Sequence, residues 1–318
     1  MQLLAAPDKF RGTLSAQEAA AAIAAGAERA GWTAVELPLA DGGEGTLDVL
    51  GGGNRRTLVS GPLGEPVEAA WRLEEDGTAL IEAAQACGLT LAGGREGNDP
   101  LRATSRGVGE LIAAAVADGA ERIVVAVGGV ASTDGGAGAT EAVPHPLLVP
   151  LEVACDVDAR FLEAADVFAP QKGATPEQVR ILRERLAQLV VPDLPGSGAA
   201  GGLAGGLAAI GARLVPGFDL VAERVGLREQ LAAADLVVTG EGLVDATSTT
   251  GKVVGRVLQR ARAAGIEGLV VAGDVTPESP IAALSLVASY GPERALSEPA
   301  ECLTELVESA LATRRNGP

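Results

Sequence analysis

The sequence predicts an α/β protein in which a doubly wound parallel sheet is interrupted by an inserted α/β domain with a mixed sheet. Short apolar strands alternate with helical segments at both ends of the chain, which is the pattern of parallel βαβ units. Between them, three consecutive strand-like segments are joined by tight turns, which favours antiparallel pairing. The glycines Gly51, Gly52 and Gly53 lie where the two patterns meet. We therefore expect a discontinuous sheet domain, residues 1–53 and 227–318, around an inserted domain, residues 54–226.

The sheet domain is expected to begin with a strand and a helix. Ser15 and Glu18 have capping-box spacing and predict the start of a helix that ends near Ala30. The later part of the domain repeats the alternation of strands and helices, so the same sheet continues there. The expected strands are residues 2–6, 33–37, 236–239, 268–272 and 283–288, and the later helices are residues 251–264 and 299–312.

The inserted domain has a different texture. Its helix at residues 175–189 is indicated by Thr175, Pro176 and Gln178, which combine a cap with proline at the first helical position. A second helix is expected at residues 104–117. The expected strands are residues 56–59, 67–73, 79–83, 123–127 and 151–155.

Composition narrows the function. The chain has 318 residues, 47% of them hydrophobic but only 2% aromatic, so a large core must consist mainly of Ala, Val and Leu. The net charge of −17 argues against nucleic-acid or anionic-membrane partners. No apolar run has the length of a membrane span, and the three cysteines are widely spaced, which fits a reducing cytoplasm. His145 is the only histidine, which makes a histidine base improbable.

Three acidic, glycine-rich loops point to one kind of chemistry. The strand at residues 123–127 runs into the first loop, residues 128–138, which contains Asp134. A similar loop contains Asp41 and Glu44, and a third contains Glu241 and Asp245. Carboxylates suit Mg²⁺, and glycines let phosphate approach the backbone closely. The alternative for Asp134 is that it only caps the following helix.

The three lysines also stand out. Lys9, Lys172 and Lys252 are the only lysines among 25 basic residues, and each lies in a short polar or glycine-flanked segment. Lysine is a compact charge suited to phosphate oxygens. The alternative is chance placement on a solvated surface.

Two common nucleotide-binding motifs receive little support from the sequence. A literal G-x-G-x-x-G occurs at Gly196, Gly198 and Gly201, but Pro192 and Pro195 precede it and rule out the required strand. A Walker A motif is absent, because Gly251 and Lys252 lack its other residues.

Taken together, the motifs resemble one family, the type 1 glycerate kinases. The matching segments run in the family's order over nearly the whole chain: residues 6–15, 38–46, 128–138, 155–158, 170–174, 195–202 and 239–252. The resemblance implies a flavodoxin-like domain that carries an inserted restriction-endonuclease-like α/β domain. It also implies phosphoryl transfer from ATP to glycerate, with 2-phosphoglycerate as the product.

The chain departs from the family pattern in the inserted domain. Family members usually carry a few dozen more residues in the gap that only residues 139–150 span here. Thr133 replaces a family Asn, and the stretch after Asp158 is shorter. Asp156 and Asp158 carry over by position as metal candidates, but their surroundings do not.

Each candidate residue is assigned a role on these grounds. Asp8 or Asp134 is the expected base; Asp41, Glu44 and Asp245 are expected near Mg²⁺ or the substrate hydroxyl; and Lys252 and Lys172 are expected on ATP phosphates. Lys9 and Arg11 suit the glycerate carboxylate. The full expected set is Asp8, Asp41, Asp134, Asp245 and Lys252 for catalysis; Lys9, Arg11, Glu44 and Thr133 for substrate; Gly42, Gly43, Lys172, Gly198, Gly240, Glu241 and Gly251 for ATP; and Asp156 and Asp158 for metal.

Two other functions remain open on the sequence alone. The shortened insert is compatible with a non-catalytic protein that binds a nucleotide or small acid. The Gly196 motif leaves an NAD-linked oxidoreductase as a weaker alternative. The expected assembly is a monomer or a homodimer.

Overall fold

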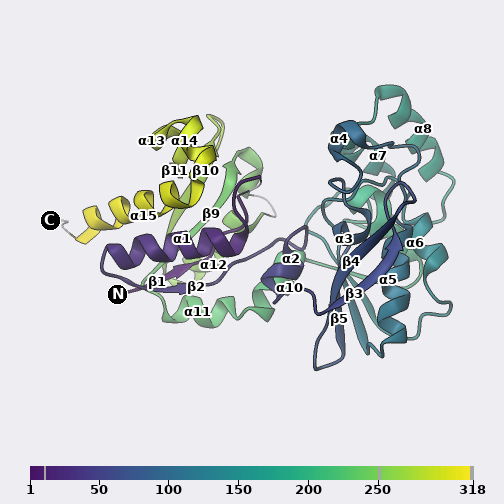
Figure 1. Ribbon diagram of the computed structural model, residues 1–318, viewed down its shortest axis with the longest axis horizontal. Coiled ribbons are helices and arrows are strands. Elements are labelled where there is room, and N and C mark those ends of the chain that lie inside the picture. Colours follow the sequence, from purple (N-terminus) through teal and green to yellow (C-terminus); the bar gives the residue numbers. More distant parts are fainter. Residues whose placement is uncertain (11, 250–251, 316–318) are drawn as a thin grey trace. The chain divides into compact units, whose positions relative to one another are not determined.

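The computed structural model describes residues 1–10, 12–249 and 252–315, and the chain divides into two compact units (Figure 1). Unit 1 comprises Met1–Asp41 and Phe218–Pro318, and unit 2 comprises Gly42–Gly217. Both boundaries lie earlier in the chain than the sequence predicts. The backbone N–H groups of Gly45 and Leu47 each donate to Oε2 of Glu82 at 3.0 Å, which ties this segment to unit 2 before the triple glycine is reached.

The second boundary moves because the chain re-enters unit 1 at Phe218. Arg260 binds Asp219 at 2.7 Å, and its guanidinium lies over the Phe218 ring. These contacts fix helix α10 (Gly217–Arg224) to helix α12 (Val253–Ala264). The expected boundary near Gly226 is therefore inside unit 1.

Unit 1 is built on the parallel sheet that the sequence predicts. The order is β11-β10-β9-β1-β2, and all neighbours are parallel. Numbered from β1, this is the flavodoxin order 2-1-3-4-5, in which ligands bind beyond the carboxyl ends of the strands. The strands are β1 (Gln2–Ala5), β2 (Thr33–Glu36), β9 (Leu236–Val244), β10 (Glu267–Val275) and β11 (Leu284–Ser285).

Side chains alternate between two cores, one on each face of this sheet. Val271 packs in the larger core with helices α1 and α15, whereas Val270 and Ala272 pack in the smaller core with α12. Small residues let α1 and α15 approach closely, since a Cβ on Gly26 would lie 2.4 Å from the Thr304 carbonyl oxygen. The helices are α1 (Ala16–Arg29), α10, α11 (Leu227–Ala233), α12, α13 (Leu286–Tyr290), α14 (Pro292–Ser297) and α15 (Pro299–Arg315), with a 3₁₀ turn at Ala246–Thr249.

The structure confirms the capping box at Ser15 and Glu18. The strand predicted at residues 283–288 is wrong after its first residues. Ser285 accepts a hydrogen bond from the N–H of Ala288 at 3.0 Å and so caps α13, which converts most of the segment to helix.

Unit 2 contains the expected mixed sheet, in the order β3-β4-β5-β6-β7-β8. β3, β4 and β5 pair antiparallel, and β5 to β8 pair parallel. Its core packs α5 against the sheet around Trp71 and Ile81. The strands are β3 (Arg55–Ser60), β4 (Pro66–Leu73), β5 (Thr78–Glu82), β6 (Arg122–Ala126), β7 (Leu151–Ala154) and β8 (Arg213–Val215).

The helices of unit 2 are mostly short. Thr175 caps α8 with Pro176 at its first position, as predicted. The helices are α2 (Thr46–Val49), α3 (Ala84–Cys87), α4 (Gly94–Gly97), α5 (Arg106–Ala117), α6 (Ala137–Ala142), α7 (Ala164–Phe168), α8 (Pro176–Leu186) and α9 (Leu203–Ala209), with 3₁₀ turns η1 (Phe161–Glu163), η2 (Pro170–Lys172) and η3 (Ala199–Gly202). Among the described residues, no helix is long and apolar enough to cross a membrane.

Candidate active site

The carboxyl edge of the unit 1 sheet gathers charged side chains from several strands. The N–H of Asp8, just after β1, donates to the Gly240 carbonyl on β9 at 2.9 Å. On the other side, the N–H of Leu39 donates to the Pro7 carbonyl at 2.9 Å, which carries the segment after β2 to the same edge. Asp41 follows this segment directly. We call Asp8, Lys9, Asp41, Glu241, Asp245 and Lys252 the edge cluster.

Asp8 has the most perturbed carboxyl group of the edge cluster. Its burial and the negative charge of Asp41 raise its pKa from 3.8 to about 7, and Glu241 adds to the effect. The N–H of Lys9, which donates to Asp8 Oδ1 at 2.7 Å, and the charge of Lys9 oppose the rise. A carboxyl group that titrates near neutral pH is suited to accept a proton during catalysis.

Lys252 links the other two carboxylates of the edge cluster. Its Nζ lies 3.5 Å from Glu241 and 3.3 Å from Asp245. Burial raises the pKa of Glu241, whereas hydrogen bonds from Thr247 hold the pKa of Asp245 down at about 2. Lys252 also occupies the N-cap position of α12, without a capping hydrogen bond from its side chain, and the helix dipole favours anions there.

Ser248 belongs to this network, although it is not among the site residues expected from the sequence. Its hydroxyl accepts a hydrogen bond from the N–H of Asp245 at 3.0 Å and lies 3.5 Å from Lys252 Nζ. An Asp followed by hydroxyl residues is typical of an Asx or ST turn, so the signal was present in the sequence.

Unit 2 holds the first acidic glycine loop, residues 128–138, after β6. Asp134 accepts hydrogen bonds from the N–H and hydroxyl of Ser105, both at 2.8 Å, and from the N–H groups of Gly136 and Gly138. These bonds fasten the beginnings of α5 and α6 together. They favour the capping interpretation of Asp134, and its catalytic role stays a prediction. Thr133 is buried, and its hydroxyl has no hydrogen-bond partner among the described residues.

Lys172 also lies in unit 2, and it is buried rather than presented to solvent. Only 4% of its surface is exposed, and its Nζ donates to the carbonyl oxygen of Ser132 at 2.5 Å. This arrangement does not leave the ammonium group available to ATP phosphates, so we revise the role expected from the sequence.

Packing accounts for several glycines that were expected at ATP. A Cβ on Gly42 would lie 2.6 Å from the Gly217 Cα, and one on Gly198 would lie 2.4 Å from the Arg160 carbonyl oxygen. A Cβ on Gly240 would lie 2.2 Å from the Val271 carbonyl oxygen of the neighbouring strand. Gly43 lies against Gly128, since a Cβ on Gly128 would lie 2.5 Å from the Gly43 Cα. The next residue of each segment is also in contact, because Glu44 lies beside Gly129. These glycines permit close backbone contacts inside each unit.

The remaining candidates are the two expected metal ligands, Asp156 and Asp158, and the residues Arg11 and Gly251. Asp156 accepts a hydrogen bond from the N–H of Gly217 at 3.1 Å, and Asp158 is exposed. Within residues 1–10, 12–249 and 252–315, no group of three His, Cys, Asp or Glu side chains is placed to hold a metal ion. Arg11 and Gly251 lie outside the described residues.

The G-x-G-x-x-G segment has no dinucleotide-binding geometry. It follows an irregular segment rather than a strand and leads into η3, in which Ala200 has a positive φ of 55°. The prediction that this motif is a false match is confirmed.

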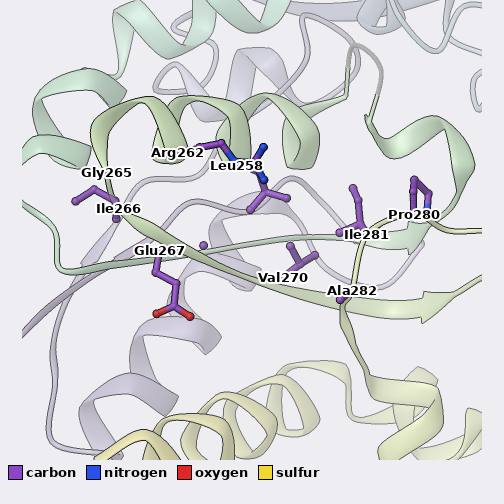
Figure 2. A pocket seen from close by; sticks show the side chains of 10 residues that line it. Leu258, Arg262, Gly265, Ile266, Glu267, Val270, Pro280, Ile281 and Ala282 are labelled. Atoms are coloured by element: carbon purple, nitrogen blue, oxygen red, sulfur yellow. The ribbon is translucent and has the colours of Figure 1, made fainter.

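A cavity of about 690 Å³ in unit 1 lies away from the edge cluster (Figure 2). Leu258 and Arg262 of α12, Val270 of β10 and Ile281 of the loop before β11 line it. It also includes Glu267, the first residue of β10, and therefore extends toward the amino ends of the strands. Ligands of open parallel sheets bind at the opposite edge.

Comparison with known proteins identifies the family. A family model described as the glycerate kinase family matches residues 3–148 and 144–313. The chain belongs to the glycerate kinase family. The two matched segments meet within residues 139–150, where the sequence predicts that family residues are missing.

Named relatives agree with this membership. The chain is 38% identical over 331 residues to a glycerate kinase of Bacillus subtilis (strain 168), covering 88% of this chain and 86% of that protein. It is 38% identical over 305 residues to the glycerate 2-kinase of Escherichia coli (strain K12), covering 80% of each. A crystal structure of a protein described as glycerate kinase 2, from Salmonella typhimurium LT2, matches with a TM-score of 0.80 and 34% identity, over 100% of this chain and 99% of that chain.

Proposed function

We propose that this enzyme transfers the γ-phosphoryl group of ATP to glycerate and forms 2-phosphoglycerate and ADP. Membership of the glycerate kinase family supports the reaction class, and the relative named glycerate 2-kinase supports the position of the phosphate. The observation that carries the proposal is Asp8, a half-buried residue at the carboxyl edge of the sheet, whose pKa is raised to about 7 by desolvation of its carboxyl group and by the charge of Asp41.

The edge cluster supplies the groups that this reaction needs. The 2-hydroxyl oxygen of glycerate attacks the γ-phosphorus, its proton passes to Asp8, and the bond to the β–γ bridging oxygen breaks to release ADP. Lys252 neutralises phosphate charge, while Lys9 binds the glycerate carboxylate. Asp245 and Ser248 hold Lys252 in place through the contacts at 3.3 and 3.5 Å.

The donor set of the edge cluster fits Mg²⁺. The charge of Asp41 raises the pKa of Asp8, so the edge cluster carries excess negative charge that a cation beside Asp41 would relieve, with Asp8 left as the base. Glu241 Oε1 is buried without a hydrogen-bond partner in the described part of the chain. Mg²⁺ is usually held by one or two carboxylates together with phosphates and water, and therefore needs no larger protein cage. When bound, the ion would supply charge neutralisation for the phosphates.

The proposal extends to the setting of the reaction. All three cysteines are free thiols, and a reducing cytoplasm keeps them so. We propose that the enzyme acts there as a monomer or a homodimer.

The decisive test is an ADP-release assay with ATP, Mg²⁺ and a panel of small hydroxy acids. We expect release that depends on both Mg²⁺ and glycerate, and phosphorus NMR should place the phosphate on the 2-hydroxyl. ATP binding by calorimetry without acid-stimulated ADP release would contradict the proposal and identify a binding protein instead.

A further inference from the structure

Lys172 is held against the first acidic glycine loop by more than one contact. Its Nζ donates to the Ser132 carbonyl oxygen at 2.5 Å. Asn98 Nδ2 donates to the Lys172 carbonyl at 2.9 Å and to the Ala131 carbonyl at 3.3 Å. No carboxylate oxygen lies within ion-pair distance of Lys172 Nζ in the part of the chain that the structure describes. The ammonium group is thus committed to the loop backbone.

Because the peptide group is planar, the hydrogen bond from Lys172 to the Ser132 carbonyl also fixes the direction of the Thr133 N–H. The Ser132 carbonyl and the Thr133 N–H belong to one trans peptide, in which the two groups point in opposite directions. Because the carbonyl points at Lys172, the Thr133 N–H points away from it. No described residue accepts a hydrogen bond from this N–H. The Thr133 hydroxyl is also buried, and it has no hydrogen-bond partner in the described part of the chain.

Gly201 closes the loop from another side. A Cβ at this position would lie 2.3 Å from the Ser132 oxygen, 2.7 Å from the Thr133 Cα and 2.9 Å from Lys172 Nζ. The Gly201 carbonyl accepts a hydrogen bond from the N–H of Gly135 at 3.1 Å. The peptide between Ser132 and Thr133 therefore has little room to rotate.

We infer that Lys172 is a positioning residue, which acts through the Ser132 carbonyl to present the Thr133 N–H and hydroxyl to an oxyanion of a bound ligand. The ligand group is a carboxylate or a phosphate, and Lys172 itself does not touch it. This inference rests on the proposed function for the identity of the ligands, glycerate and nucleotide. This indirect role takes the place of the direct contact between Lys172 and ATP phosphates that was expected from the sequence.

The charge of Lys172 adds to this effect. Burial lowers its pKa to about 8, and the Asp134 carboxylate, which faces it from the loop, opposes the shift; the Cys87 thiol of α3 also faces it and stays neutral in this pH range, because burial raises its pKa to about 12. The protonated amine polarises the peptide and makes the Thr133 N–H a stronger donor. By linkage, an anion on the loop raises the pKa of Lys172, and the anion binds more tightly below pH 8 than above it.

The first test follows the lysine directly in the wild-type chain. With ¹³C-labelled lysine, the protein gives only three Cε signals, which Lys→Met variants assign. We expect the midpoint of the Lys172 titration to lie near 8 and to rise on saturation with the ligand whose oxyanion occupies the loop. Glycerate and ADP are added in separate arms, so the arm that moves the midpoint identifies the source. A midpoint that moves with neither ligand would overturn the inference.

The second test measures ligand affinity by calorimetry at pH 7 and pH 9.5. In the wild type, affinity for the same ligand should fall about tenfold between these values, which corresponds to a one-unit pKa change. Lys172→Met should bind weakly at both, while the matched control Arg180→Met, which removes an exposed cation of α8, should behave as the wild type. A folded Lys172→Met protein with unchanged affinity and pH dependence would show a merely structural lysine. Failure of glycerate phosphorylation with these linked pH effects intact would refute only the proposed function.

Discussion

At the scale of single residues, the surroundings of Asp8 in the edge cluster disfavour its ionised form. Burial and the neighbouring Asp41 oppose its ionised form, so the site holds a carboxylate that is poorly stabilised until it accepts a proton. This is the condition that a catalytic base working near neutral pH requires. The same residue therefore links activity and stability in opposite directions.

Asp8→Asn should remove activity and stabilise the fold. Since the folded pKa of Asp8 is raised from 3.8 to about 7, folding becomes less favourable as pH rises through this range. The full loss of folding stability is reached above pH 7, where the substitution should raise the free energy of unfolding by up to about 4 kcal/mol. We expect a higher Tm at pH 8, little change below pH 3.8, and a loss of about 10²–10⁴ in kcat. A lower Tm at pH 8 would contradict this account.

The pH profile should report the same carboxyl group. We expect kcat to rise with pH to a plateau, with its midpoint near 7. Asp41→Asn removes a charge that raises the pKa of Asp8, so it should move the midpoint to lower pH. An unchanged midpoint in this variant would assign the profile to another group.

Lys252→Met should lower kcat/KM by two orders of magnitude or more, because it removes the cation that faces Glu241 and Asp245. The Lys252 side chain is 32% exposed, so the Tm should change little. Steady-state kinetics and thermal unfolding separate the two effects. A loss of Tm comparable to that of a core deletion would make Lys252 a structural residue.

Lys172 is a residue whose environment could not be predicted from the sequence. The sequence draws attention to the three lysines, because they are rare and lie in short polar or glycine-flanked segments. It did not distinguish a lysine that faces a ligand from one that faces a carbonyl, since burial of Lys172 depends on Ser132 and Gly201, which are distant in the chain. Asp134 poses the same problem, because its main partner is Ser105.

At the scale of elements, glycines set how closely neighbouring strands and helices approach. Local patterns predicted the capped helices α1 and α8 and most strands, since caps and alternation are local signals. They failed at β11 and α13, where the apolar segment is short and Ser285 caps a helix within it. Periodicity over so few residues does not separate strand from helix.

Gly240 and Gly268 form a matched pair for testing close packing in the unit 1 sheet. A Cβ on Gly240 would lie 2.2 Å from a backbone oxygen, whereas one on Gly268 would lie 2.5 Å from Leu258 Cδ2, a side-chain atom that can move into the adjacent cavity. We expect Gly240→Ala to cost about 3 kcal/mol and Gly268→Ala less than about 1 kcal/mol. Chemical denaturation measures both. Equal losses would show that Leu258 cannot move.

At the scale of the whole molecule, each unit has its own core. Unit 2 is continuous in sequence, with six strands in one sheet. The change along the chain from strand–helix alternation to consecutive strands joined by tight turns predicted this organisation. The boundaries were misplaced because the triple glycine is a visible signal, whereas the bonds from Gly45 and Leu47 to Glu82 join distant residues.

Unit 2 should fold by itself when residues 42–217 are expressed alone. We expect a cooperative thermal transition and dispersed amide NMR signals, because its core lies within the segment. The isolated unit should not release ADP, since it lacks the edge cluster. Residues 1–41 alone should remain unfolded as a control. A molten unit 2 would show that its core depends on unit 1.

The split of unit 1 has a consequence for synthesis on the ribosome. β1 pairs with β2 on one side and with β9 on the other, so its second edge stays open until Leu236 has been made. At 5–20 residues per second, that wait is on the order of ten to forty seconds. During it, an apolar parallel strand pair and the alanine-rich α1 are exposed while unit 2 completes itself. The nascent chain is thus vulnerable at its first residues, long after they have been translated.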